Sequence, residues 1–291
     1  MDKENYGLLS GSNWVQSIDF GWADLFNPRD ELKLTSEQKG RPMRHQDKVV
    51  IVTGAGRNIG EETAILFVKE GAKVAVVDLD DRGEGVAAAI NASNPDCAIF
   101  IKANVAEEDS VKNMISETVN AFGRIDTLIN NVAISDNLTI RECTLADFQK
   151  TIDVTLTSQF LTCKYAGEQM IEQGDGGVIV NIGSTSGCKG RDSAVAYCAA
   201  KGGVANLVRA IASQYAQYGI RVNSVVPNRI GSPVGKQEFD PDRYVTNMLH
   251  RPGLPQELAA AVNFMASDEA SFIYGENLFV DGGYSAMMDG S

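Results

Sequence analysis

The sequence predicts a doubly wound α/β fold, in which helices cover both faces of one parallel sheet. Short β-branched runs alternate with longer helix-like segments, and glycines follow several of those segments. No tandem repeat or low-complexity stretch interrupts the alternation. Because crossovers between parallel strands are right-handed, the pattern predicts a single domain with a sheet of about seven strands.

The elements follow one another in a regular order. The first strand is expected at 49–54 (VVIVTG), and the helix over 61–70 ends before Gly71, a residue type common just after a helix. The later strands are expected at 73–78, 98–103, 124–130, 177–183, 220–226 and 276–282. The later helices are expected up to about 91 and over 107–122, about 145–173, about 194–218 and 255–267, with Gly219 ending the fourth of these.

Residues 1–46 differ in residue pattern from the rest of the chain. They contain five isolated aromatic residues, among them both tryptophans, and show no sustained period. Exposed aromatic surface is unfavourable, so we predict an extension that packs on the body or on a neighbouring subunit. A flexible arm is the alternative, since chain termini are often loose. The domain proper is then expected to cover 47–291.

Composition excludes several classes of function. Lys and Arg number 26 against 38 Asp and Glu, and the net charge of -12 disfavours nucleic acid and anionic membranes as partners. The five cysteines are scattered and the histidines number two, with no CxxC or HExxH, so no metal site is expected. No long apolar run or basic-then-apolar start suggests a membrane span or a secretory signal. We therefore expect a cytoplasmic protein.

A glycine-rich turn, TGAGRNIG (53–60), follows the first strand and opens a helix. Small residues there let the backbone approach a pyrophosphate, and the helix N-terminus offers free N–H groups to it. A tight strand-to-helix connection is the alternative interpretation. Asp78 ends the next strand, where a carboxylate accepts hydrogen bonds from a ribose and repels a 2′-phosphate. NAD is therefore favoured over NADP, with Arg57 as the opposing signal.

Tyr197 and Lys201 stand four residues apart on the predicted helix 194–218, so they share one face. A free phenol has a pKa of about 10, and a neighbouring ammonium and a cationic nicotinamide both favour the phenolate. We expect the pKa of Tyr197 to fall towards the working range for proton exchange. Ser184, at the end of the fifth strand, is placed to hold a substrate oxygen. A solvated helix face is the alternative for any Tyr-x-x-x-Lys pair.

Taken together, these motifs resemble the short-chain dehydrogenase/reductase family over 47–285. The matching segments are TGAGRNIG (53–60), NNVA (130–133), STSG (184–187), YCAAK (197–201), RVNSVVP (221–227) and VDGG (280–283). The resemblance implies a Rossmann-like fold with Tyr197 as general acid/base. It also implies that Lys201 lowers the pKa of Tyr197 and binds the nicotinamide ribose, and that Ser184 orients the carbonyl or hydroxyl. Hydride then passes between the substrate carbon and nicotinamide C4.

The same resemblance assigns a set of cofactor contacts and exposes departures from the family pattern. The contacts are Gly54, Arg57, Asn58, Ile59, Gly60, Asp78, Asn104, Val105, Asn131, Tyr197, Lys201, Pro227, Ile230 and Ser232. Asn58 replaces the middle glycine of the turn and is expected to tolerate left-handed geometry. Asn104 replaces an aspartate, and its oxygen is expected to accept from the adenine amine. Thr155 replaces the asparagine of the proton relay, where a backbone carbonyl and water can serve instead.

The segment 228–253 interrupts the alternation beside the cofactor site and is predicted to form a substrate lid. Pocket residues predicted by position are Ile134, Ser135, Lys189, Arg191, Asn228 and His250. Lys189 and Arg191 suit an anionic substrate, or else they are merely solvated charges.

The expected activity is that of an NAD(H)-dependent secondary alcohol dehydrogenase or ketone reductase. The substrate is a cyclic or steroid-like alcohol, a sugar or polyol, or a 3-oxoacyl thioester. A homotetramer, or a homodimer, is implied by the family resemblance. The alternative is a protein of the same fold that binds NAD for regulation or scaffolding and turns over little.

Overall fold

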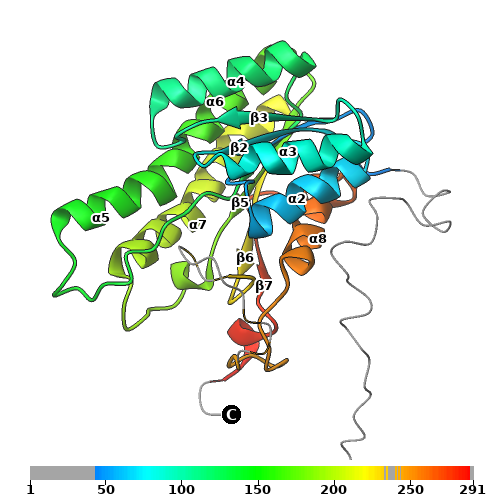
Figure 1. Cartoon of the computed structure of the whole chain (residues 1–291). Helices are drawn as coiled ribbons and strands as arrows, with labels where there is room; N and C mark the ends of the chain where they lie inside the picture. Colours follow the sequence, from blue (N-terminus) through cyan, green and yellow to red (C-terminus); the bar gives the residue numbers. More distant parts are fainter. Residues whose placement is uncertain (1–42, 233, 235–239, 241, 243, 289–291) are drawn as a thin grey trace, which may run out of the picture. The chain divides into compact units, whose positions relative to one another are not determined.

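Seven parallel strands form one sheet in the order β3-β2-β1-β4-β5-β6-β7 (Figure 1). The computed structural model describes residues 43–288 except 233, 235–239, 241 and 243, all within one compact unit. The strands are β1 Val49–Thr53, β2 Lys73–Asp78, β3 Ala98–Lys102, β4 Thr127–Asn130, β5 Gly177–Ile182, β6 Ile220–Pro227 and β7 Asn277–Val280. The predicted fold class and strand number are confirmed.

Helices pack on both faces of the sheet and divide the core in two (Figure 1). Successive strand side chains point to opposite faces, so Val50 and Val52 lie in one half of the core and Ile51 in the other. The first half is covered by α2 Asn58–Lys69, α3 Arg82–Ser93 and α8 Pro255–Ala266. The second is covered by α4 Glu108–Phe122, α6 Ser158–Gln173 and α7 Val195–Tyr215.

Short 3-10 turns complete the elements. They are η3 Thr185–Gly187, η4 Ala216–Tyr218, η5 Asp268–Ala270 and η6 Tyr284–Ala286. None of the helices in the described part of the chain is long and apolar enough to cross a membrane.

The segment expected as one helix over 145–173 is divided into three parts. An α-helix, α5 Leu145–Ile152, runs into a π-helical turn, η2 Asp153–Thr157, before α6 begins. Hydroxyl side chains explain the change, because Ser158 Oγ donates to Val154 O at 2.7 Å and the hydroxyl of Thr155 leaves the helix for another segment. Such π turns are frequent at functional sites.

The strand order reverses between β1 and β4, which is where ligands bind in doubly wound sheets. The glycine-rich turn leaves the carboxyl end of β1, and the NNVA segment leaves that of β4. Strands β5 and β6 end at the same edge because all strands are parallel. The fold therefore brings the predicted motifs to one edge of the sheet.

The last residues of the predicted extension, 43–46, lie against the sheet domain, whereas residues 1–42 are outside the described part. His45 N donates to Glu70 O at 2.9 Å, and its ring lies 4.5 Å from that of Phe67 between centroids. Arg44 pairs with Glu269, with 2.9 Å between Nε and Oε1. His45 is only 2 % exposed, so its imidazole is part of the core.

We expect His45 to make the protein sensitive to mild acid. Burial lowers the pKa of His45 to about 4, although contacts with Asn263 and Glu70 oppose the change. Below the ordinary pKa of about 6.5, His45 becomes protonated in the unfolded chain but stays neutral in the folded chain. Stability therefore falls between about pH 6.5 and 4, by up to about 3 kcal/mol.

Urea unfolding at several pH values measures this loss in the wild type and in His45→Phe. The variant should lose less stability on acidification. His250→Gln is the matched control, because His250 is exposed and should leave the pH dependence unchanged. Identical curves for wild type and His45→Phe would show that other groups control acid unfolding.

Candidate active site

The turn after β1 forms a cradle whose glycines allow close backbone approach. A Cβ on Gly60 would lie 2.1 Å from Gly54 O, so α2 can start against the turn only with glycine there. Asn58 has φ +55, the left-handed geometry expected of it. The α2 N-terminus is directed at this turn and offers N–H groups to an anion. The turn therefore fits a dinucleotide pyrophosphate.

Asp78 lies against the same turn at the end of β2. Gly56 N donates to Asp78 Oδ2 at 2.8 Å, and Asp80 N donates to Oδ1 at 3.0 Å. A Cβ on Gly56 would come within 2.9 Å of the carboxylate, so glycine is needed for this contact as well. The carboxylate keeps lone pairs for a further donor, because each oxygen accepts more than one hydrogen bond.

The side chains of Asn131 and Asn104 form hydrogen bonds to other groups of the protein. Asn131 Nδ2 donates to Thr53 O at 3.2 Å and Gly54 O at 3.1 Å, which ties β4 to the turn. Asn104 Nδ2 donates to Glu107 Oε1 at 2.8 Å, while its Oδ1 accepts from Ala106 N at 3.2 Å. Asn104 thus folds over the start of α4, and its adenine contact stays a prediction. Val105 beside it is buried.

Ser184, Tyr197 and Lys201 come together at the carboxyl ends of β5 and β6. Tyr197 is 5 % exposed, and its side chain is hydrogen-bonded to that of Ser184. Ser184 opens the short turn η3, where its Oγ accepts from Ser186 N at 3.1 Å. Lys201 lies one helical turn after Tyr197, with Nζ 5.8 Å from the ring centroid. The structure therefore assembles all three predicted catalytic side chains.

The expected lowering of the Tyr197 pKa is wrong for this structure. Burial raises the pKa of Tyr197, and the hydrogen bond with Ser184 and the charge of Arg191 offset only part of that rise. Burial also lowers the pKa of Lys201 to about 7, so its amine is only partly charged at neutral pH. Lys201 Nζ donates to Ile182 O at 2.6 Å rather than to the phenol. Desolvation is the largest cause of both changes.

Thr155 is fully buried in the π turn and holds the loop that follows β4. Its Oγ1 donates to Ile134 O at 3.1 Å and accepts from Ile134 N at 3.1 Å. One donor and one acceptor are what an amide side chain would also offer here. The threonine thus makes two backbone bonds that do not require asparagine.

The start of the predicted lid is fixed to both the turn and the catalytic serine segment. Asn58 Nδ2 donates to Ser232 Oγ at 2.9 Å, and Asn228 Nδ2 donates to Thr185 Oγ1 at 2.7 Å. Ile230 forms an isolated parallel bridge with Gly253. Both ends of the 228–253 segment therefore meet beside the cradle. Residues 233, 235–239, 241 and 243 of the lid lie outside the described part.

The predicted pocket residues are more dispersed. Lys189 Nζ lies 4.8 Å from the Tyr284 ring centroid, and Arg191 is exposed but lowers the pKa of Tyr197 through its charge. Ser135 Oγ donates to Asn137 Oδ1 at 3.0 Å. The exposed His250 stacks on Tyr244 at 5.6 Å between centroids. Ile134 N donates to Thr155 Oγ1, and Asn228 Nδ2 donates to the hydroxyl of Thr185, the residue after Ser184.

One contact at this site could not be found from the sequence. Asp136 accepts hydrogen bonds from the backbone of Ala196 and Tyr197. Local capping residues are expected just before α7, at Asp192 or Ser193, whereas Asp136 lies about sixty positions earlier.

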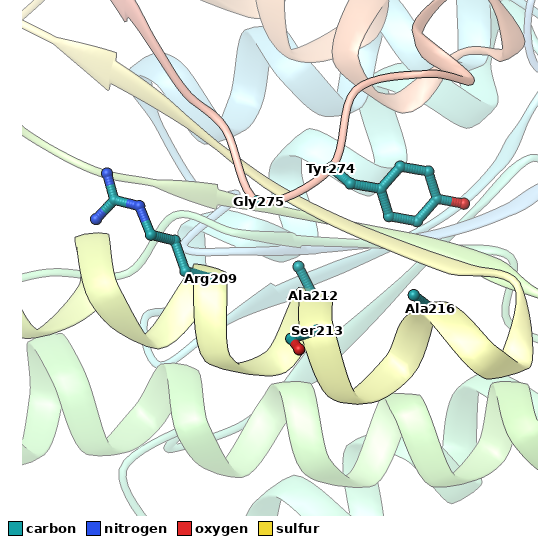
Figure 2. A pocket seen from close by; sticks show the side chains of 6 residues that line it. All are labelled: Arg209, Ala212, Ser213, Ala216, Tyr274 and Gly275. Atoms are coloured by element: carbon teal, nitrogen blue, oxygen red, sulfur yellow. The ribbon is translucent and has the colours of Figure 1, made fainter.

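A surface cavity of about 600 Å³ lies elsewhere, along the last turns of α7 and the chain before β7 (Figure 2). It is lined by Arg209, Ala212, Ser213, Ala216, Tyr274 and Gly275. Figure 2 shows Tyr274 and Gly275 on one side and the small side chains of α7 on the other. Tyr197 and Lys201 belong to the opposite end of α7, so the cavity is separate from the candidate active site. Among the described residues no cluster of His, Cys, Asp or Glu suits a metal ion.

The family model described as enoyl-(acyl carrier protein) reductase matches residues 54–285, which include the turn, Ser184, Tyr197 and Lys201. The chain belongs to the short-chain dehydrogenase/reductase family. It is therefore an oxidoreductase for alcohol or ketone groups that uses a nicotinamide cofactor.

The chain matches relatives over nearly the whole of their length. The chain is 38% identical over 248 residues to 2,5-dichloro-2,5-cyclohexadiene-1,4-diol dehydrogenase of Sphingobium indicum, covering 82% of this chain and 98% of that one. It is 36% identical over 246 residues to cis-4-hydroxycyclohexanecarboxylate dehydrogenase of Sinomonas cyclohexanicum, covering 83% and 98%. The crystal structure of levodione reductase superposes with a TM-score of 0.78 at 34% identity, covering 84% of this chain and 100% of that chain.

Proposed function

We propose that this protein is an NAD(H)-dependent dehydrogenase of secondary alcohols, or a reductase of the corresponding ketones, that acts on cyclic substrates. The assembly of Ser184, Tyr197 and Lys201 at the sheet edge that also carries the glycine cradle supports it best. Two relatives are named for a cyclohexane or cyclohexadiene alcohol, which favours a ring substrate over a polyol or a 3-oxoacyl thioester.

In this mechanism each side chain has one task. A bound nicotinamide dinucleotide supplies or accepts the hydride. The Ser184 hydroxyl orients the substrate oxygen, and the Tyr197 phenol gives that oxygen a proton in reduction or removes it in oxidation. Lys201, when protonated, favours the phenolate of Tyr197 and so assists proton removal. Thr155 holds Ile134 and with it the loop at the substrate side of the site.

A panel of cyclic ketones, polyols and 3-oxoacyl thioesters, each with NADH and NADPH, tests the proposal by nicotinamide absorbance. We expect turnover with cyclic ketones and NADH. Binding of NADH without turnover on any substrate would favour the alternative, a regulatory or scaffold protein. The hydrogen bond between Tyr197 and Ser184 argues against that alternative. Asn58 and Thr155, which depart from the family pattern, also make well-formed hydrogen bonds.

Removing the charge of Asp78 should weaken the preference for NAD. Asp78→Asn keeps an acceptor for Gly56 N but removes the carboxylate proposed to bind the ribose. Hydrogen bonds to charged groups contribute about 1.5–3 kcal/mol, so kcat/KM with NAD should fall about 10- to 100-fold while that with NADP rises. Asp80→Asn is the control, since Asp80 is exposed and pairs with Arg82. A wild type that prefers NADP would refute the assignment.

The proposed assembly is a homotetramer. Large apolar side chains are exposed on two parts of the fold, with Leu145 81% and Phe160 47% exposed on α5 and α6, and Phe272 100% and Tyr274 44% exposed before β7. Large exposed apolar side chains of this kind can be buried at subunit interfaces. Light scattering should give four times the 31.3 kDa chain mass, and Phe272→Asp should lower it. A monomeric wild type would contradict the assembly.

A further inference from the structure

The helix that carries Tyr197 starts without a cap of its own. Ala194, at its N-cap, has φ +63 and a methyl side chain that cannot accept a hydrogen bond. The nearby Ser193 hydroxyl donates to Asp192 Oδ1 at 3.4 Å instead of turning to the helix. The first N–H groups of α7 must therefore find acceptors elsewhere.

The loop after β4 supplies those acceptors. Asp136 Oδ1 accepts from Tyr197 N at 3.0 Å, and Oδ2 accepts from Ala196 N at 3.3 Å. Leu138 O accepts from Val195 N at 3.3 Å. Three consecutive N–H groups of α7 are thus satisfied by residues 136–138. A carboxylate at this position also interacts favourably with the positive end of the helix dipole.

The position of this contact matters because of what the first turn carries. The backbone of Tyr197 is held by Asp136, and its side chain reaches Ser184. The same loop is fixed at its other end, where the Ile134 backbone is bonded to Thr155 in the π turn. Asp136 therefore joins a fixed loop to the residue whose phenol must meet the substrate oxygen.

We propose that Asp136 is a positioning residue for Tyr197, which holds the phenol in register with Ser184 and Lys201 through two hydrogen bonds to the first turn of α7. The proposal rests on the proposed function, in which Tyr197 exchanges the proton. Asp136 does not touch the reacting atoms and acts only through the backbone of Tyr197.

Steady-state kinetics of Asp136→Ala test this role against a matched cap. Thr144 caps α5 in a similar way, since its Oγ1 accepts from Asp147 N at 3.1 Å, yet α5 carries none of the three catalytic side chains. Asp136→Ala should lower kcat about 10- to 100-fold, because small displacements of a reacting group are costly, and leave KM for NADH within about twofold. Thr144→Ala should leave both within about twofold.

A second measurement does not depend on turnover. The ζ-carbon NMR signal of Tyr197, assigned with Tyr197→Phe, reports the titration of the phenol while Ser184, Arg191, Cys198 and Lys201 remain in place. In Asp136→Ala the titration of Tyr197 should move to lower pH, because burial is what raises the pKa of Tyr197 and a phenol that is no longer held in place gains water. Thr144→Ala should titrate like the wild type. Asp136→Asn keeps one acceptor and serves the same purpose if the alanine variant does not fold.

The outcomes separate the two claims. If Asp136→Ala matches Thr144→Ala in kcat and in the titration of Tyr197, Asp136 is an ordinary helix cap and the proposal is overturned. If the wild type turns over no substrate, the proposed function fails, and the NMR titration alone then decides the role of Asp136.

Discussion

Replacing Tyr197 with phenylalanine should lower turnover by a factor on the order of 10³ and leave NADH binding nearly intact. Phenylalanine fills the same buried space, in which Tyr197 is 5 % exposed, so the fold and the neighbouring cradle are preserved. Only the hydroxyl that bonds to Ser184 and exchanges the proton is lost. The loss is large because no other described titratable side chain is placed on Ser184 in the same way.

Stopped-flow hydride transfer and NADH fluorescence titration measure the two quantities separately. Tyr215→Phe is the control, because Tyr215 lies at the far end of the same helix, where its hydroxyl donates to Cys163 O at 3.5 Å. Its turnover should stay within about twofold of the wild type. Substantial residual turnover in Tyr197→Phe would assign the proton to another group and end the proposed mechanism.

Replacing Arg221 with methionine should lower the free energy of unfolding by about 3–5 kcal/mol. Arg221 is 6 % exposed in β6, where burial lowers the pKa of its guanidinium. The guanidinium donates to the carbonyls of Met265, Ala266, Ser267 and Ala270 at 3.0, 3.4, 2.8 and 3.1 Å. These carbonyls end α8 and form η5, and their partial negative charge stabilises the cation. Methionine would remove these donors and leave Ser267 O and Ala270 O only their backbone bonds from Ala270 N and Ile273 N.

Urea unfolding provides the measurement, and Arg82→Met is the matched control. Arg82 forms a true ion pair with Asp80 at 2.9 Å, but both side chains are about half exposed, so its loss should destabilise the protein far less than the loss of Arg221. Because α8 packs on α2, Arg221→Met should also weaken NADH binding. A stability loss no larger than that of Arg82→Met would show that water replaces the guanidinium at no cost.

The strands were predictable because buried parallel strands are continuous β-branched runs. KVAVVD was expected at 73–78 and forms β2 at Lys73–Asp78. The expected strand 124–130 begins only at Thr127, since the carboxylate of Asp126 accepts from Val49 N at 2.9 Å and pairs with Arg124 before the ladder starts. The π turn at Asp153–Thr157 could not be predicted from the sequence either, because the hydroxyl of Thr155 bonds to a loop twenty-one residues earlier.

The site divides in the same way. The spacing of Tyr197 and Lys201 places them on one helical face, and the end of β5 places Ser184 near them, which the structure bears out in geometry. The direction of the Tyr197 pKa was predicted wrongly, because spacing shows that two groups are neighbours but not how deeply each is buried. The bond from Asn58 to Ser232 joins residues 174 positions apart and has no local signal.

The sequence by itself determined the order of strands and helices, the cradle turn and the candidate catalytic side chains, since periodicity and motif spacing are local properties. Only the tertiary structure decided what desolvates Lys201 and Tyr197, what caps the helix that carries them, and what closes the C-terminus of α8. Each of these depends on groups far apart in the chain, here Asp136 with Tyr197 and Arg221 with Ser267. Burial and hydrogen bonding across such distances follow from packing, which no local pattern encodes.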